Sequence, residues 1–136
     1  MLFDYFADLN WLAVLVAALA YFVLGAIWYS NMLFGKAYRA ALGITEQGTP
    51  NPSLLVINFV GWFITATALG LVGAAAGASS VLDGIVLGFV AGVGFVVVHQ
   101  VVAGTFDPGR RALMSVTVPY TVPGFVIMGV ILAVWQ

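Results

Sequence analysis

The sequence contains no cysteine and few charged residues. Without cysteine the chain can form no disulfide scaffold, thiolate metal site or iron–sulfur cluster, and it has no thiol redox chemistry. Charged residues make up 7% of its 136 residues, against about a quarter in a typical soluble domain. Four basic residues against five acidic ones leave a net charge of −1 and no basic tract. This composition excludes a disordered protein and a protein that binds nucleic acid.

Apolar side chains are present in large excess, at 63% of the residues. A chain of this size cannot hide so many of them in a core, because small domains leave a large share of their surface exposed. The composition therefore excludes a soluble globular enzyme and predicts an integral membrane protein.

Four segments are long and apolar enough to cross a bilayer, which takes about 20 mostly apolar residues. They are residues 9–29, 53–76, 81–106 and 112–135. The charged side chains lie in the connections, in the N-terminal tail or at the edges of spans. This placement is expected because a charge at the middle of a spanning helix costs about 2.5–3.5 kcal/mol. We predict an all-α fold, a four-helix transmembrane bundle that forms a single domain over residues 1–136.

The basic residues predict the orientation of the bundle. Lys36 and Arg39 lie between the first and second spans, and Arg110 and Arg111 lie between the third and fourth. The positive-inside rule places both connections in the cytoplasm and both termini outside. We expect a multi-pass protein of a bacterial inner membrane or cell membrane. The first span has no basic residue before it, so we expect it not to be a cleaved signal peptide.

Several helix starts show capping residues. Asn51-Pro52 and Asp107-Pro108 each fit an N-cap followed by proline at the first helical position. Ser80 with Asp83 resembles a capping box. Residues 33–42 place apolar side chains at four-residue spacing, which favours a short helix lying in the membrane interface between the first two spans.

Three glycines in the third span, Gly84, Gly88 and Gly92, recur every four residues. Small residues at this spacing let two helix backbones approach closely, which drives helix packing in lipid. The pattern does not say whether the contact lies within one chain or between copies. Because four short helices bury little against one another, we expect the protein to form a homo-oligomer.

His99 is the only histidine of the chain. The residues that share its helical face, at about 100° per residue, are Gly88, Gly92, Phe95 and Ala103. Because this is a packing face, we expect His99 to point into protein. Three interpretations stay open: a proton relay or substrate contact, a ligand of a metal or porphyrin, and a hydrogen bond to a neighbouring helix, which we favour. No second ligating residue lies inside the spans, so we expect no metal site and no cofactor.

The second span carries a stripe of residues at helical spacing, Asn58, Gly61, Trp62 and Thr65. Polar side chains at this spacing either bond across helices or line a narrow hydrated path.

Two prolines interrupt the fourth span, Pro119 and Pro123, with Tyr120 between them. Each proline frees the carbonyl four residues earlier, on Ser115 and Pro119. A freed carbonyl in a membrane needs a side chain, water or a ligand as donor. Ser115, Pro119 and Tyr120 are therefore candidate lining residues of a pore or ligand site.

The chain resembles a known family in three stretches near its start and one at its end. They are NWLAV at residues 10–14, GAIWYS at 25–30, LFGKA at 33–37 and GVILAVW at 129–135. They resemble the domain-of-unknown-function family 1761. The resemblance implies a small multi-spanning membrane protein to which no activity is assigned.

Three classes of function remain. The first is a homo-oligomeric channel or transporter for a small solute, lined by His99, Asn58 and Thr65. The second is an accessory or assembly subunit that packs on a larger membrane complex or organises membrane lipids. The third, an intramembrane enzyme, is not expected, because one histidine without a nucleophile or metal cluster gives no catalytic site.

Overall fold

The computed structural model describes residues 1–44 and 51–136. All regular elements of these residues are helical. They are the 3₁₀-helix η1 (Leu2–Tyr5), α1 (Trp11–Trp28), α2 (Gly35–Leu42), α3 (Pro52–Ala75), α4 (Val81–Ala91), the π-helix η2 (Gly92–Val97), α5 (Val98–Phe106) and α6 (Pro108–Val134). Because α4, η2 and α5 follow one another without a break, the described residues hold four helices long and apolar enough to cross a membrane. The predicted all-α fold with four long apolar helices is confirmed.

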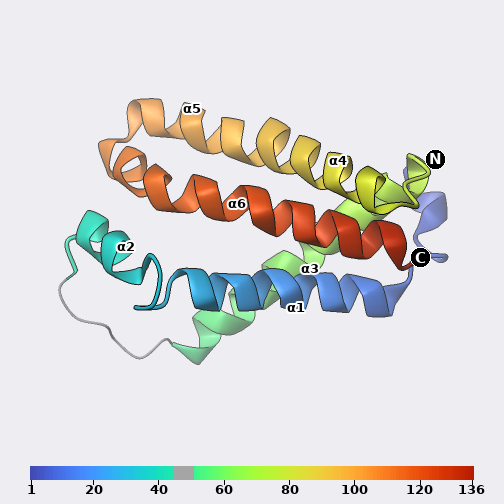
Figure 1. Cartoon of the computed structure of the whole chain (residues 1–136), viewed down its shortest axis with the longest axis horizontal. Helices are drawn as coiled ribbons and strands as arrows, with labels where there is room; N and C mark the ends of the chain where they lie inside the picture. The colour runs from blue at the N-terminus through green and yellow to red at the C-terminus, as the bar shows by residue number, and fades with distance from the viewer. Residues whose placement is uncertain (45–50) are drawn as a thin grey trace.

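Helix α6 lies at the centre of the bundle. Of its most apolar stretch 50% is buried, against 17–28% in the other three spans. Helices α1, α3 and α4 all pack against it, and Figure 1 shows α6 between α1 and the α4–α5 helix. The third span therefore lies at the edge of the bundle and packs mainly against α6.

The two connections that carry basic residues lie at the same end of the bundle. In Figure 1 the short helix α2 and the turn between α5 and α6 are at one end, and both termini are at the other. Helix α2 packs against α6. Because both termini lie at the same end, the arrangement agrees with an even number of crossings. We still predict that the basic end faces the cytoplasm and that α2 lies in the membrane interface.

Local capping explains where the helices begin. Asn51 Oδ1 accepts a hydrogen bond from Ser53 N at 2.9 Å, and Ser80 and Asp83 form a capping box. Asp107 Oδ1 accepts from Gly109 N at 3.0 Å, so α6 begins at Pro108. The helix start predicted at Asp107-Pro108 is confirmed, and α6 therefore begins before the apolar span that we expect from residue 112.

The glycines of α4 lie directly against the backbone of α6. A methyl group added at Gly84 would lie 2.5 Å from Val130 Cα, and one added at Gly88 would lie 2.6 Å from Val126 Cα. Gly92 faces the side chain of Phe125. These contacts answer the question that the spacing leaves open, since the glycine face is occupied within the chain.

Candidate functional site

Two of the residues singled out from the sequence, Trp62 and Tyr120, meet in the core. Trp62 stacks on Tyr21, with ring centroids 3.8 Å apart and planes 15° from parallel. Tyr120 meets the same ring edge-on at 4.9 Å. Trp28 and Tyr29 also lie against Tyr120. We call these five residues of α1, α3 and α6 and the α1 C-cap the aromatic cluster.

Hydrogen bonds hold the aromatic cluster to the backbone. Trp28 Nε1 donates to Val116 O at 3.1 Å, and Tyr120 Oη donates to Tyr21 O at 3.4 Å. Burial raises the pKa of Tyr29, beside Tyr38, to about 12, so this phenol is neutral at physiological pH. We therefore interpret the aromatic cluster as a structural contact that holds α1, α3 and α6 together.

Tyr21 lies at the centre of the aromatic cluster, and the sequence analysis did not single it out. It is 1% exposed and lies in the middle of α1. A signal existed in the sequence, because aromatic residues of membrane helices gather at the interfaces and this one does not.

The proline-bearing face of α6 points outward. Pro119 and Ser115 are four residues apart, and both are exposed. The cross-helix donor from α1 reaches Val116, the residue after Ser115. Pro119 and Ser115 therefore lie outside the contact between α1 and α6, whereas Pro123 is half-buried.

The predicted polar stripe of α3 does not face a common path. Asn58 is exposed, and its Nδ2 donates to Leu54 O at 2.9 Å. Thr65 Oγ1 donates to Gly61 O at 3.0 Å. Both side chains thus bond to their own helix, and only Trp62 of this stripe turns to the core.

His99 is exposed in the single chain, so it does not lie on the packed face of Gly88 and Gly92 where we expected it. That it meets protein stays a prediction. The expectation assumed an unbroken α-helix, in which eleven residues from Gly88 make about three turns. The π-helix η2 lies between them, and its wider turn takes in an extra residue. Three turns from Gly88 therefore end at Gln100, and His99 rotates to the outside.

Gln100 joins α5 to a polar pair in the core. Gln100 Nε2 donates to Thr121 Oγ1 at 3.2 Å, and Thr121 is 2% exposed. Tyr21 Oη lies near Thr121, but without a hydrogen bond of good geometry. The sequence analysis missed Gln100 and Thr121. Each directly follows a residue that it did single out, His99 or Tyr120.

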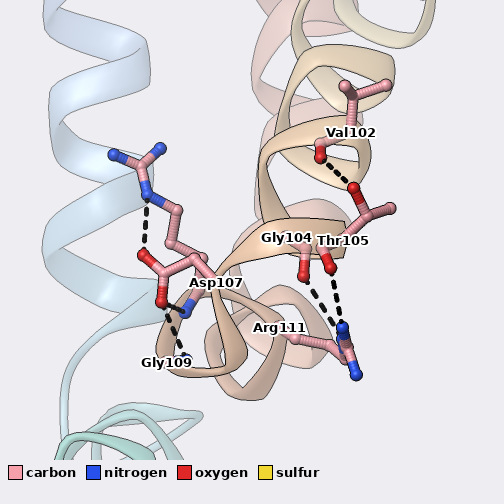
Figure 2. A network of polar contacts seen from close by, with 7 residues as sticks. Val102, Gly104, Thr105, Asp107, Gly109 and Arg111 are labelled. Atoms are coloured by element: carbon pink, nitrogen blue, oxygen red, sulfur yellow. Dashed lines mark hydrogen bonds and ion pairs between the residues drawn. The ribbon is translucent and has the colours of Figure 1, made fainter.

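The basic residues at the loop end have structural partners. Arg111 donates from Nε to Gly104 O at 3.2 Å and from Nη2 to Thr105 O at 3.1 Å, which closes the end of α5 (Figure 2). Arg110 Nε pairs with Asp107 Oδ2 at 3.4 Å. Arg39 bonds to Asn31, and Lys36 is exposed on α2.

Metal binding finds no support in the described residues, where no three His, Asp or Glu side chains come together. Their polar side chains bind backbone carbonyls, cap helices or join helices. These contacts stabilise the helices and their packing.

Comparison with known proteins gives one match. The model of the family described as "Protein of unknown function (DUF1761)" matches residues 12–133, from the first turn of α1 to the last turn of α6. No curated protein and no solved structure matches the chain. The family that the sequence resembles is confirmed.

Proposed function

The chain belongs to the DUF1761 family, and we propose that it works as a homo-oligomer in the membrane. The contact between copies is a face that we call the outer face of α5. It consists of Val98, His99, Val102 and Phe106 of α5, together with Phe95 of the preceding η2. The single observation that carries the proposal is the exposure of His99 on this face. The face surrounding it is apolar and open, with Phe95, Val102 and Phe106 exposed by 76%, 54% and 89%.

The imidazole of His99 favours contact with another protein over contact with lipid. Lipid tails offer neither donors nor acceptors, so ionisable residues in spans almost always face other protein or a water-filled cavity. A neutral imidazole carries one donor and one acceptor. Two-fold symmetry brings a residue near the axis next to its own copy, and one imidazole can then donate a hydrogen bond to the other.

The position of the third span supports this contact. The span packs mainly against α6, so its far side is open to a neighbour along the bilayer. We also place the path of a solute at this contact between copies. The polar side chains of one chain point to different sides and do not line a common path, whereas the proposed contact brings two His99 rings together.

Energy transfer between labelled copies in liposomes tests the proposal. Because the chain lacks cysteine, Met32→Cys in the exposed loop provides a single labelling site. In this background we expect His99→Leu to weaken association about 3- to 18-fold, the equivalent of about 0.6–1.7 kcal/mol for an interhelical hydrogen bond. His99→Asn, which keeps a donor and an acceptor, should retain most of it.

The matched control is Ile64→Leu, an exposed position on α3 and outside the outer face of α5, which should leave association unchanged. Equal energy transfer in wild type and His99→Leu, or a monomer at every protein-to-lipid ratio, would contradict the proposal.

A second candidate is an accessory subunit of a larger complex, and α3 provides the observation that favours it. Residues 51–58, which include Asn58, are exposed on every side, so the start of α3 leaves the bundle. A partner helix could pack there and bond to Asn58. Native nanodiscs test this: a co-released larger protein that is lost in Asn58→Leu and kept in His99→Leu would favour the accessory function.

A further inference from the structure

A pocket opens at the end of the bundle where the two termini lie (Figure 1). It has a volume of about 220 Å³, and its lining comes from η1, α1, α3 and the end of α6. At about 30 Å³ for each water molecule of the liquid, it has room for one small organic molecule. Because neither His99 nor any other residue of the third span lines it, the pocket does not depend on the contact between copies.

Buried apolar residues of three helices form the floor of the pocket. They are Val14 of α1, Gly70 of α3 and Leu132 of α6. A methyl group added at Gly70 would lie 3.5 Å from Leu132 Cδ2 and 3.9 Å from Val14 Cγ2. The side chains of Val14 and Leu132 thus converge on a glycine that leaves the space between them open. The floor is therefore suited to an apolar group.

The mouth of the pocket holds an acidic side chain without a partner. Tyr5 and Asp8 line the mouth, and both are exposed. The amide group of Asn10 is occupied, since Oδ1 accepts from Ala13 N at 3.1 Å and Nδ2 donates to Trp135 O at 3.2 Å. The carboxylate of Asp8, by contrast, makes no hydrogen bond or ion pair with the residues that the structure describes. It is therefore an accessible acceptor with a free negative charge.

The distribution of charge favours a cation at this end of the bundle. Both loops that carry the four lysine and arginine residues of the chain lie at the opposite end (Figure 1). Asp4, the other carboxylate near the start of the chain, is paired with the amino group of Met1. No lysine or arginine therefore competes for Asp8. A cation bound beside the low-dielectric membrane also interacts with a carboxylate more strongly than it does in bulk water.

The lining also selects the kind of cation. A metal ion such as Ca²⁺ takes several oxygen ligands, and Asp8 is the one acidic residue among the described residues of the lining. The rings of Tyr5 and Trp135 line the pocket as well, and aromatic rings attract organic cations to their faces. The lining therefore favours an organic cation with an apolar part.

We propose that this pocket binds an alkylammonium group. The ammonium nitrogen donates to the carboxylate of Asp8 beside the rings of Tyr5 and Trp135, and the alkyl chain lies on the floor at Gly70. A soluble amine and the headgroup of an ethanolamine lipid both supply such a group.

Cysteine protection tests the site, since the wild-type chain has no cysteine. Ala74→Cys places a thiol in the lining, and Ala75→Cys places one at the next residue of α3, which is exposed and lies outside the lining. In a neutral maltoside detergent, we expect butylammonium to slow the reaction of Ala74→Cys with iodoacetamide and to leave Ala75→Cys unaffected. Butanol has a similar shape and no charge, and it should need a concentration about 3- to 30-fold higher for the same protection.

The contribution of the carboxylate is measured with Asp8→Asn in the Ala74→Cys protein. We expect this substitution to weaken protection by butylammonium about 1.5- to 5-fold, as for an exposed ion pair, and to leave protection by butanol unchanged. The matched control is Asp4→Asn, which removes a negative charge from the same end but does not line the pocket. It should change neither.

The floor is tested with Gly70→Ala. Its methyl group makes only ordinary van der Waals contacts, so we expect the variant to fold with a shallower pocket. Protection by butylammonium should weaken more than protection by the shorter methylammonium. Gly61→Ala on the same helix, where an added methyl group has nothing within 4 Å, should protect as the parent does.

Added lipid identifies the source of the ammonium group. Phosphatidylethanolamine in the micelles should by itself protect Ala74→Cys if the lipid headgroup occupies the site, whereas phosphatidylglycerol, which has no amine, should not. Protection by butylammonium and by neither lipid would assign the site to a soluble amine.

Three outcomes would overturn the proposal. Equal protection by butylammonium and butanol would show that the pocket recognises no charge. Equal protection of Ala74→Cys and Ala75→Cys would place the effect outside the pocket, and unchanged protection in Asp8→Asn would remove the carboxylate from the site. Titration calorimetry of the wild-type chain compares the same two probes without any substitution, so the test remains decisive if Ala74→Cys does not fold.

Discussion

At the scale of the residue, the closest contacts in the bundle are made by glycines that meet a neighbouring backbone. Gly88 faces Phe125 and Val126 of α6, whereas Gly94 in the same span has nothing within 4 Å of an added methyl group. The two positions are thus a matched pair. Alanine brings a similar gain in helix propensity at both, about 1 kcal/mol. The positions differ in the space available, and Gly94 lies in η2 rather than in α4.

We predict that Gly88→Ala lowers the free energy of unfolding by about 1–3 kcal/mol, because an added methyl group overpacks the contact between α4 and α6 and pushes the two helices apart. Gly94→Ala should be neutral or stabilising. Thermal unfolding of both variants in the same detergent measures the difference. Equal stability of the two variants would mean that α4 does not contact α6 through Gly88.

The residue scale also shows where sequence reasoning ends. The four-residue spacing of glycines predicts that two backbones meet, but the neighbour depends on the tertiary fold, and it is α6. The outcome for His99 has the same cause. Its helical face follows from counting turns, and one extra residue in η2 transfers the inward position to Gln100.

At the scale of the element, the features that depend on neighbouring residues were predictable. Asn51, Ser80 and Asp107 cap their helices as expected, because a cap involves only the first turn. The π-helix η2 was not predictable. Nothing in the sequence of residues 92–97 distinguishes it from an apolar α-helix, and its wider turn keeps Gly92 and Gly104 on one buried side.

We predict that deletion of Gly94 converts η2 to regular α-helix and leaves the facing of α5 unchanged, because eleven residues then lead from Gly88 to Gln100 and make about three turns. Gln100 should keep its hydrogen bond to Thr121, and His99 should stay outside. The free energy of unfolding should therefore stay close to that of the control Gly94→Ala, which keeps the length. A large loss of stability in the deletion variant alone, measured by thermal unfolding, would contradict the account of η2 as a turn with one extra residue.

At the scale of the whole molecule, composition predicted a membrane protein, because 63% apolar residues in 136 are more than a core of this size can bury. The four spans and the common end of the two basic loops followed from the apolar runs and the charges. The central place of α6 did not follow, since its apolar pattern resembles that of the other spans and its burial comes from packing.

Topology can be measured with single cysteines in the two loops. We predict that Met32→Cys and Gly109→Cys are labelled by an impermeant reagent from the cytoplasmic side, because the four basic residues lie at that end. Phe3→Cys near the N-terminus should be labelled from the outside. Labelling of the loops from opposite sides would contradict the arrangement in Figure 1.

The assembly of copies through the outer face of α5 is the central claim, and disulfide crosslinking in native membranes tests it most directly. Val102 lies three residues after His99 on this face and Ile64 lies on α3, and both are exposed. On oxidation, we expect Val102→Cys to yield a covalent dimer and Ile64→Cys to remain monomeric. A monomer in both variants, or a dimer through Ile64→Cys alone, would contradict the account.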